Sequence, residues 1–426
     1  MYVLHRKLIK SALLGTIVVL LSGQVFAQAS ECGKKRDVTT GALDEATWKR
    51  MNDVFEDVGE ERYDSAFETL QKMNTRAQGK YEKAILAQAL AQVEWSRSNY
   101  DAALTDFETA VRLDALPDLA HFSLMYQISQ LYYMKNRYDE ALDKLALWMC
   151  KAPKEKITPA SYYLKAAIYT AKQDWKNVVS AIDTAISMSD EPKESWYQLK
   201  LGAHFELEQF PKVAQTLEIM VQHWPDKKNY WIQLSQIYYK LKKDDEALSV
   251  LALAYRRNML DKQTDILYLS SMYSNKDVPF KAAKVLQKGM EDGIVESNKR
   301  HWMIVADAWF TAEEMDNALV AYEKAGQASD DGEIDLRRAY ILVDMERWDE
   351  AAMAVEAALD KGGFSERKTC DAYVLQGMSE FNLGNYNKAS TAWGRASKYP
   401  KAKKSAQQWM NHMREERARK SSWSGV

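Results

Sequence analysis

A short pattern of large and small residues recurs along the chain at intervals of 33 to 38 residues. A large residue, usually aromatic, opens each copy, and Ala or Val stands three residues later. Apolar residues follow four and seven positions after the small one, which is the spacing of one helix face. Self-similarity at this period predicts a stack of helix–turn–helix units. The small residues of the ten copies are Ala66, Ala103, Ala141, Val178, Val213, Ala247, Ala282, Ala318, Ala351 and Ala389.

A second set of small residues stands twelve positions before the first set. It includes Ala91, Ser129, Ala166, Ser235, Ser270, Ala306 and Gly377. Small side chains at paired positions let the two helices of a unit approach closely, and a larger side chain there costs ~1–3 kcal/mol by overpacking. Acidic residues directly after the opening aromatic suit the start of the second helix, where the helix dipole favours negative charge. Each unit is therefore expected to be a helical hairpin.

The combined pattern resembles the tetratricopeptide repeat, W-x2-L-G-x2-Y, then A-x3-F, then A and P. The resemblance implies an all-α solenoid, a right-handed superhelix of about ten repeats over residues 47–403, followed by a capping helix. We expect this cap at about Lys401 to Arg419, with Ala406, Trp409, Met410 and Met413 on one side. Residues 404–426 are thus expected to comprise the capping helix and a basic tail. Residues 28–46 are expected to form a disordered lead-in.

The amino-terminal residues have the order of a secretory signal peptide. Basic residues Arg6, Lys7 and Lys10 precede an uncharged apolar run, and small residues end it at Ala27 and Ala29. Cleavage fits after either alanine, and we prefer cleavage after Ala27, which gives a signal peptide of residues 1–27. An uncleaved anchor is the alternative, but the run is shorter than the ~20 residues of a spanning helix. Glu31 beside Cys32 argues against a lipoprotein. We therefore expect export to the periplasm of a Gram-negative bacterium.

Composition limits the class of partner. The chain has a formal charge of −2, which becomes −5 without the three basic residues of the signal peptide. Nucleic acid is not expected to be a partner, because phosphate binding needs a basic surplus. Only 8 Pro and 17 Gly occur in 426 residues, which favours helix almost everywhere. The basic stretch from Arg395 to Lys420 is either a solvated face of the cap or a contact for anionic lipid or an acidic partner.

Three cysteines remain after the signal peptide, namely Cys32, Cys150 and Cys370. An odd number leaves at least one thiol unpaired or paired between chains. Cys150 and Cys370 lie in distant repeats, so a bridge between them is not expected. Cys32 can fold back towards Cys150, and the sequence leaves open whether they pair.

Catalytic and cofactor motifs are absent from the sequence. There is no GxGxxG, Walker A, GxSxG or HExxH, and the histidines lack ligand spacing. The segment Asp330 to Glu333 lacks the alternating acidic ligands of a calcium loop, so a turn is expected there. We expect no enzyme activity, no cofactor, no metal and no small-molecule substrate.

A protein-binding groove is what the resemblance implies for positions 2, 5, 9 and 12 of each first helix. Aromatic and glutamine side chains at these positions suit an extended polypeptide, whereas the Lys and Asn of a carboxylate clamp are absent. Some of these aromatics are equally expected to pack between repeats. The predicted groove residues are Gln88, Gln92, Trp95, Tyr126, Gln130, Tyr133, Tyr163, Gln198, Phe205, Gln236, Tyr239, Asp307 and Phe310.

Short stretches also resemble periplasmic repeat proteins associated with TonB, ExbB and ExbD. They are residues 230–238, 278–289, 329–333, 375–386 and 406–409. The resemblance implies a scaffold that docks a TonB-type complex or its receptor in energy-driven uptake across the outer membrane, with only indirect membrane contact. A scaffold for envelope assembly and a periplasmic holdase chaperone are the alternatives. The sequence leaves open the partner, the binding face and the oligomeric state.

Overall fold

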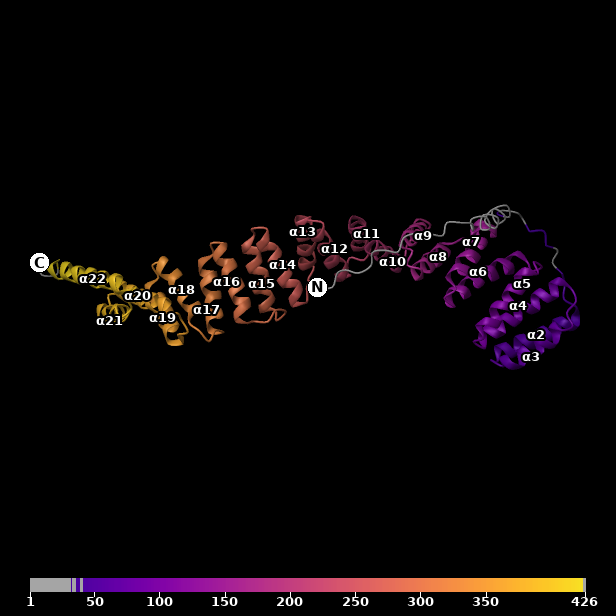
Figure 1. Cartoon of the computed structure of the whole chain (residues 1–426), viewed down its shortest axis with the longest axis horizontal. Coiled ribbons are helices and arrows are strands. Elements are labelled where there is room, and N and C mark those ends of the chain that lie inside the picture. Colours follow the sequence, from indigo (N-terminus) through magenta and orange to yellow (C-terminus); the bar gives the residue numbers. More distant parts are fainter. Residues whose placement is uncertain (1–31, 33–35, 39–40, 424–426) are drawn as a thin grey trace, which may run out of the picture. The chain divides into compact units, whose positions relative to one another are not determined.

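The computed structural model describes residues 32, 36–38 and 41–423, and these form helices, turns and loops without a strand. The chain divides into two compact units, residues 1–220 and 221–426. Consecutive helices pair as antiparallel hairpins within each unit (Figure 1). The predicted all-α class is therefore confirmed. The predicted signal peptide, residues 1–27, lies outside the described residues.

The first unit holds four complete hairpins and one that ends in the second unit. In each hairpin a first helix precedes a second helix. The pairs are α2 (Glu45–Gly59) with α3 (Tyr63–Asn74), α4 (Lys80–Ser96) with α5 (Tyr100–Arg112), α6 (Asp118–Met134) with α7 (Tyr138–Lys151), α8 (Pro159–Ala171) with α9 (Trp175–Ser187), and α10 (Glu194–Glu206) with α11 (Phe210–His223). A short 3-10 turn, η1 (Lys154–Lys156), links α7 to α8.

The second unit continues the same alternation and ends with an unpaired helix. Its pairs are α12 (Lys228–Lys240) with α13 (Asp244–Arg256), α14 (Gln263–Asn275) with α15 (Pro279–Glu291), α16 (Lys299–Thr311) with α17 (Met315–Gln327), α18 (Glu333–Asp344) with α19 (Trp348–Lys361), and α20 (Glu366–Asn382) with α21 (Tyr386–Ala396). The last helix is α22 (Lys403–Trp423). Its Ala406 and Met413 are buried, and Trp409 stacks on Trp393 at 5.7 Å between ring centroids. It covers the last hairpin as predicted.

The paired small residues lie buried between the two helices of the hairpins. All ten small residues of the second helices have an exposed fraction of 0%. In two hairpins the pairing is direct, because the Ser235 hydroxyl donates to the Ala247 carbonyl (2.8 Å) and the Ser270 hydroxyl to the Ala282 carbonyl (2.9 Å). At Gly377 an added Cβ would lie 2.2 Å from Nε1 of Trp393. Larger side chains at these positions would separate the helices.

Ion pairs link consecutive hairpins, and the repeat pattern did not predict them. The second residue of a second helix is often Asp, and it pairs with a cation at the carboxyl end of the next first helix. Arg97 binds Asp64 at 2.9 Å and Lys135 binds Asp101 at 2.8 Å, while Lys172 binds Asp139. Each charge also suits the dipole of its own helix end. Exposed pairs of this kind stabilise by only ~0–1 kcal/mol each, so they fix orientation more than stability.

The turn inside every hairpin contains one residue in the left-handed conformation. It stands two residues before the opening residue of the second helix, with φ between 54° and 64° in nine hairpins. Only the tenth hairpin has glycine there, Gly384, with φ of 80°. Non-glycine residues in this conformation cost ~1–2 kcal/mol each. These turns therefore hold strain that the hairpin packing offsets.

We predict opposite effects for the same substitution at two glycines of the last hairpin. Gly384→Ala should lower local stability by ~1 kcal/mol, because alanine disfavours the left-handed conformation. Gly394→Ala should raise it by ~0.5–1 kcal/mol, because Gly394 lies inside α21 with open space for a methyl group. Hydrogen exchange of amides in α20 and α21 measures both changes, and a loss of stability in both variants would contradict the strain argument.

Candidate protein-binding surfaces

The thirteen predicted groove residues all lie on first helices and keep part of their surface in solvent. They come from α4, α6, α8, α10, α12 and α16, and none is buried. Six are exposed, namely Gln92, Gln198, Phe205, Gln236, Tyr239 and Phe310. The other seven are half-buried.

Several predicted aromatics pack on neighbouring rings. Tyr126 lies 4.8 Å from Trp148 between ring centroids, in the same hairpin. Tyr163 stacks on Trp196 of the next hairpin at 6.2 Å. Tyr239 is 52% exposed although its edge meets Tyr268. These rings thus join adjacent helices and also present surface to solvent.

A pocket of about 280 Å³ opens beside the amino-terminal half of α6. It is mostly apolar, and Tyr126 is the predicted groove residue in its lining. Burial raises the pKa of the Tyr126 hydroxyl, which therefore stays neutral at physiological pH. The other lining residues are Asp118, Leu119, Phe122, Ser123, Trp148, Pro153 and Lys156.

A larger groove of about 710 Å³ lies in the second unit and is built by three consecutive first helices. We call it the α16–α18–α20 groove. Met303 and Tyr340 supply accessible apolar surface, Leu336 is a buried part of the lining, and charged residues line the groove as well. The remaining lining residues are Glu333, Ile334, Arg337, Ser365, Arg367, Lys368 and Asp371.

The thirteen predicted groove residues include none from the ninth and tenth repeats. Leu336 and Tyr340 stand fifteen and eleven residues before Ala351, which are positions 5 and 9 of their first helix. Continuing the same register would have found both residues. The neighbouring Arg337 and Arg367 fall outside these positions, and their place in the groove depends on how the helices pack.

Ion pairs connect the helices along this groove. Arg337 of α18 donates to Asp307 of α16 at 2.9 Å, and Lys368 of α20 binds Glu333 of α18 at 2.6 Å. Asp307 also accepts from the Tyr322 hydroxyl at 2.6 Å, and burial together with this contact raises the Tyr322 pKa. The predicted groove residue Asp307 is thus part of a network that fixes the helices.

An ion pair with a buried carboxylate lies next to the groove, at the position where five other repeats carry an aromatic residue. Asp335 is 4% exposed and accepts from Nζ of Lys361 at 2.6 Å. The same ammonium donates to the Gly326 carbonyl at 2.7 Å. An added Cβ at Gly326 would lie 2.6 Å from the Asp335 carboxylate, so a larger residue at 326 would displace this side chain.

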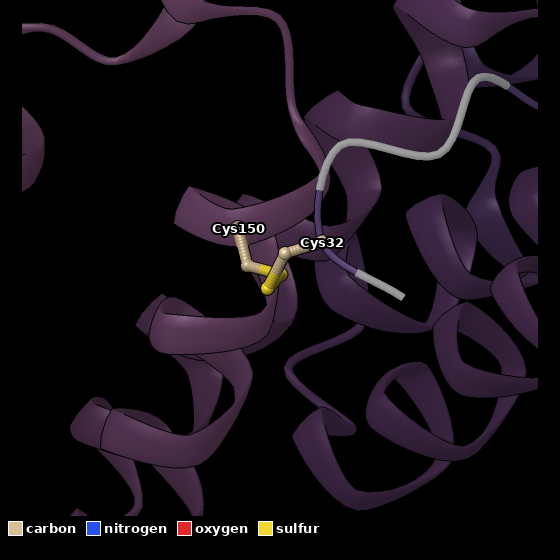
Figure 2. The surroundings of a disulfide bond; sticks show 2 residues. All are labelled: Cys32 and Cys150. Atoms are coloured by element: carbon tan, nitrogen blue, oxygen red, sulfur yellow. A yellow bond between two sulfur atoms is a disulfide. The ribbon is translucent and has the colours of Figure 1, made fainter. Parts of the chain in front are cut away.

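The described part of the expected lead-in makes fixed contacts with the repeats. Cys32 forms a disulfide with Cys150 of α7, with 4.9 Å between their Cα atoms (Figure 2). Arg36 donates to Asp114 and Asp118, at 2.8 Å each, and its side chain is only 9% exposed. Helix α2 begins at Glu45, before the expected boundary. In these residues, the expectation of a disordered lead-in is wrong, because a covalent bond and a buried guanidinium hold them.

His121 lies under this contact and has an unusually low proton affinity. It is 5% exposed, and its Nδ1 has no hydrogen-bond partner and lies 3.7 Å from the Asp114 carboxylate. Burial, and next the charge of Arg36, lower the His121 pKa to about 4. The folded state therefore holds a neutral imidazole at this position.

The sequence matches the family model "Tetratricopeptide repeat" over residues 88–152 and 336–406. These stretches lie in different units and coincide with helical hairpins, which supports the repeat assignment in both. No curated protein matches the sequence significantly. The tetratricopeptide fold suggests a scaffold for protein–protein interaction.

Solved structures of repeat proteins are similar to parts of the chain. A tetratricopeptide repeat protein from Parabacteroides merdae ATCC 43184 is 10% identical with a TM-score of 0.36, over 67% of this chain and 94% of that chain. YrrB, described as a TPR protein with an unusual peptide-binding site, is 16% identical with a TM-score of 0.31, over 46% and 97%. MamA from Desulfovibrio magneticus RS-1 is 20% identical with a TM-score of 0.30, over 40% and 93%.

Two kinds of site were not found among the described residues. In residues 32, 36–38 and 41–423, no group of three or more His, Cys, Asp or Glu side chains is placed to hold a metal ion. Within the same part of the chain, no helix has the length and apolar character needed to span a bilayer.

Acid should destabilise the region around α6 through His121. Its folded pKa of about 4 lies below the ordinary value of 6.5, so the unfolded chain takes up the proton first as the pH falls. Above pH ~7 the His121 imidazole does not change the free energy of unfolding. Between pH ~7 and pH ~4 it lowers this free energy by up to ~3 kcal/mol, since each unit of pKa difference corresponds to 1.36 kcal/mol. Hydrogen exchange of α6 between pH 7 and pH 4 measures the slope. His121→Gln should reduce it, and an unchanged slope would show that other groups cause the acid sensitivity.

Proposed function

We propose that this protein is a periplasmic scaffold and that its α16–α18–α20 groove binds an extended segment of a partner polypeptide. The observation that supports this most is the groove itself, about 710 Å³ lined by three consecutive first helices. Apolar side chains in its lining offer contact area, and paired charges around them offer hydrogen bonds. A hydrophobic centre with a polar rim is the usual composition of a protein interface.

The disulfide supports an exported protein. Disulfides persist in oxidising compartments such as the periplasm and are rare in the cytosol. Cys32 lies a few residues after the predicted cleavage site, so the bond would form only after residues 1–27 had directed export. An oxidising compartment and a signal peptide are two independent supports for this localisation.

The partner that we propose is the periplasmic part of a TonB-type complex or its receptor. This part of the proposal is based on the resemblance of short stretches, among them residues 230–238 and 375–386. Residues 329–333 form the turn before α18 and end at Glu333, which lines the groove. One of the resembling stretches therefore reaches the proposed binding surface.

Crosslinking in intact cells followed by affinity capture tests the groove. A Tyr340→Ala/Arg367→Ala variant should lose most of the crosslinked partner, because both side chains line the groove and are accessible. Met353→Ala on α19 is the matched control, since Met353 is 57% exposed and is not among the lining residues. It should retain wild-type recovery. Equal recovery from all three proteins would overturn the groove as the binding surface.

The identity of the captured proteins tests the partner separately. Recovery of TonB, ExbB or ExbD with the wild-type chain is the expected result. Subunits of an assembly machine would favour envelope assembly instead, and a heterogeneous set of clients would favour a holdase. Absence of every energy-transduction protein would overturn the TonB assignment while leaving the groove experiment valid.

A further inference from the structure

Arg36 occupies a site that is built for a guanidinium group. Its Nε and Nη1 donate to Asp114 and Asp118, at 2.8 Å each, and Nη2 donates to the Leu116 carbonyl at 3.1 Å. Its Cζ lies 5.8 Å from the ring centroid of Phe122. Two carboxylates, a carbonyl and an aromatic face satisfy the planar donors of arginine in a way that the compact ammonium of lysine cannot reproduce. We call these four acceptors the α5–α6 clamp.

The backbone of the clamp belongs to the turn between α5 and α6 and to the first turn of α6. Leu116 is fully buried, and Asp114 has the left-handed φ of 49° that turns the chain from α5 towards α6. Asp118 is the first residue of α6, and Phe122 follows one helical turn later. The Leu116 carbonyl therefore adds little conformational entropy cost to binding, whereas the exposed side chains of Asp114 and Asp118 are ordered by the guanidinium.

We propose that the α5–α6 clamp is a binding site for an arginine side chain of a partner polypeptide, and that the chain's own Arg36 blocks it while the Cys32–Cys150 disulfide is intact. The proposal goes beyond the α16–α18–α20 groove, because the clamp lies in the other unit. The Asp114 and Asp118 side chains are 60% and 55% exposed with Arg36 bound, so another polypeptide can reach them.

The neighbouring pocket extends the clamp towards a longer ligand. Asp118 and Phe122 belong both to the clamp and to the pocket of about 280 Å³. Leu119, 65% exposed, lies between them in sequence and lines the same pocket. A partner arginine in the clamp would therefore place a neighbouring apolar side chain against Tyr126 and Trp148. This geometry suits an extended segment with arginine beside an apolar residue.

The disulfide determines how strongly Arg36 competes with a partner arginine for the α5–α6 clamp. With the bond intact, Arg36 is held on both sides, by Cys32 and by the chain that leads to α2. A dithiol reductant releases the attachment at Cys32, which is an exposed residue. A thiolate of the reductant attacks the sulfur of Cys32 and forms a mixed disulfide with it. The Cys150 thiolate leaves and takes a proton from water. The second thiolate of the reductant then displaces Cys32, so the reductant leaves as a disulfide and both cysteines are reduced. The loss of one attachment lowers the effective concentration of Arg36 at the clamp.

A peptide of residues 32–38 with Ser in place of Cys32 tests the clamp directly. Its fluorescence anisotropy is titrated with the full chain carrying Cys32→Ser and Arg36→Ala, which leaves the clamp without its own ligand. We expect saturable binding to this variant and at least ~10-fold weaker binding to the oxidised wild-type chain, whose clamp is occupied. Reducing the wild-type chain should strengthen its binding.

Matched controls separate the clamp from general charge attraction. A peptide with Ala in place of Arg36, and a protein with Asp118→Asn added, should each weaken binding ~10-fold or more, as expected for the loss of a charge-assisted hydrogen bond. Glu68→Gln, which removes an exposed carboxylate of α3 in the same unit, should have no effect. Hydrogen exchange of α6 confirms that each variant is folded. Equal binding of the Arg and Ala peptides, or equal binding to oxidised wild type and to the unblocked variant, would overturn the proposal without affecting the groove experiment.

Discussion

Close approach of two helices at paired small residues is the constraint on which the rest of this structure depends. Ten small side chains, one in each second helix, are completely buried, and in two hairpins a serine of the first helix bonds directly to the facing carbonyl. This close contact fixes each hairpin, and the aromatics then fill the space to the next one. Nine turns contain a strained non-glycine residue, and this conformation persists because the two packed helices on either side of the turn hold it.

Binding surfaces arise where this regular packing is interrupted. In the ninth repeat the buried Asp335–Lys361 pair replaces an aromatic and lies beside the α16–α18–α20 groove. Between α5 and α6, the turn presents two carboxylates that Arg36 occupies. The Asp335 carboxylate is buried, whereas Asp114 and Asp118 stay more than half exposed. Charged side chains at both places require a partner of matching charge and geometry, which an apolar contact does not.

The candidate sites could be predicted only in part. A register taken from the repeats placed all thirteen groove residues on first helices with accessible surface, and the same register includes Leu336 and Tyr340. It could not find Arg367 or Lys368, whose place in the groove depends on the angle between neighbouring helices. Nor could it find the Arg36 clamp, because 78 residues separate Arg36 from Asp114 and no periodicity connects them.

The sequence by itself determined the hairpins, their number and their buried face. These features repeat, and local spacing of small and large residues decides them through the geometry of the helix. Tertiary structure alone decided that Cys32 pairs with Cys150, that Arg36 is buried between carboxylates, and that Arg337 of the groove pairs with Asp307 of α16. Such contacts occur once, between residues distant in the chain, and only the folded backbone brings their side chains within reach.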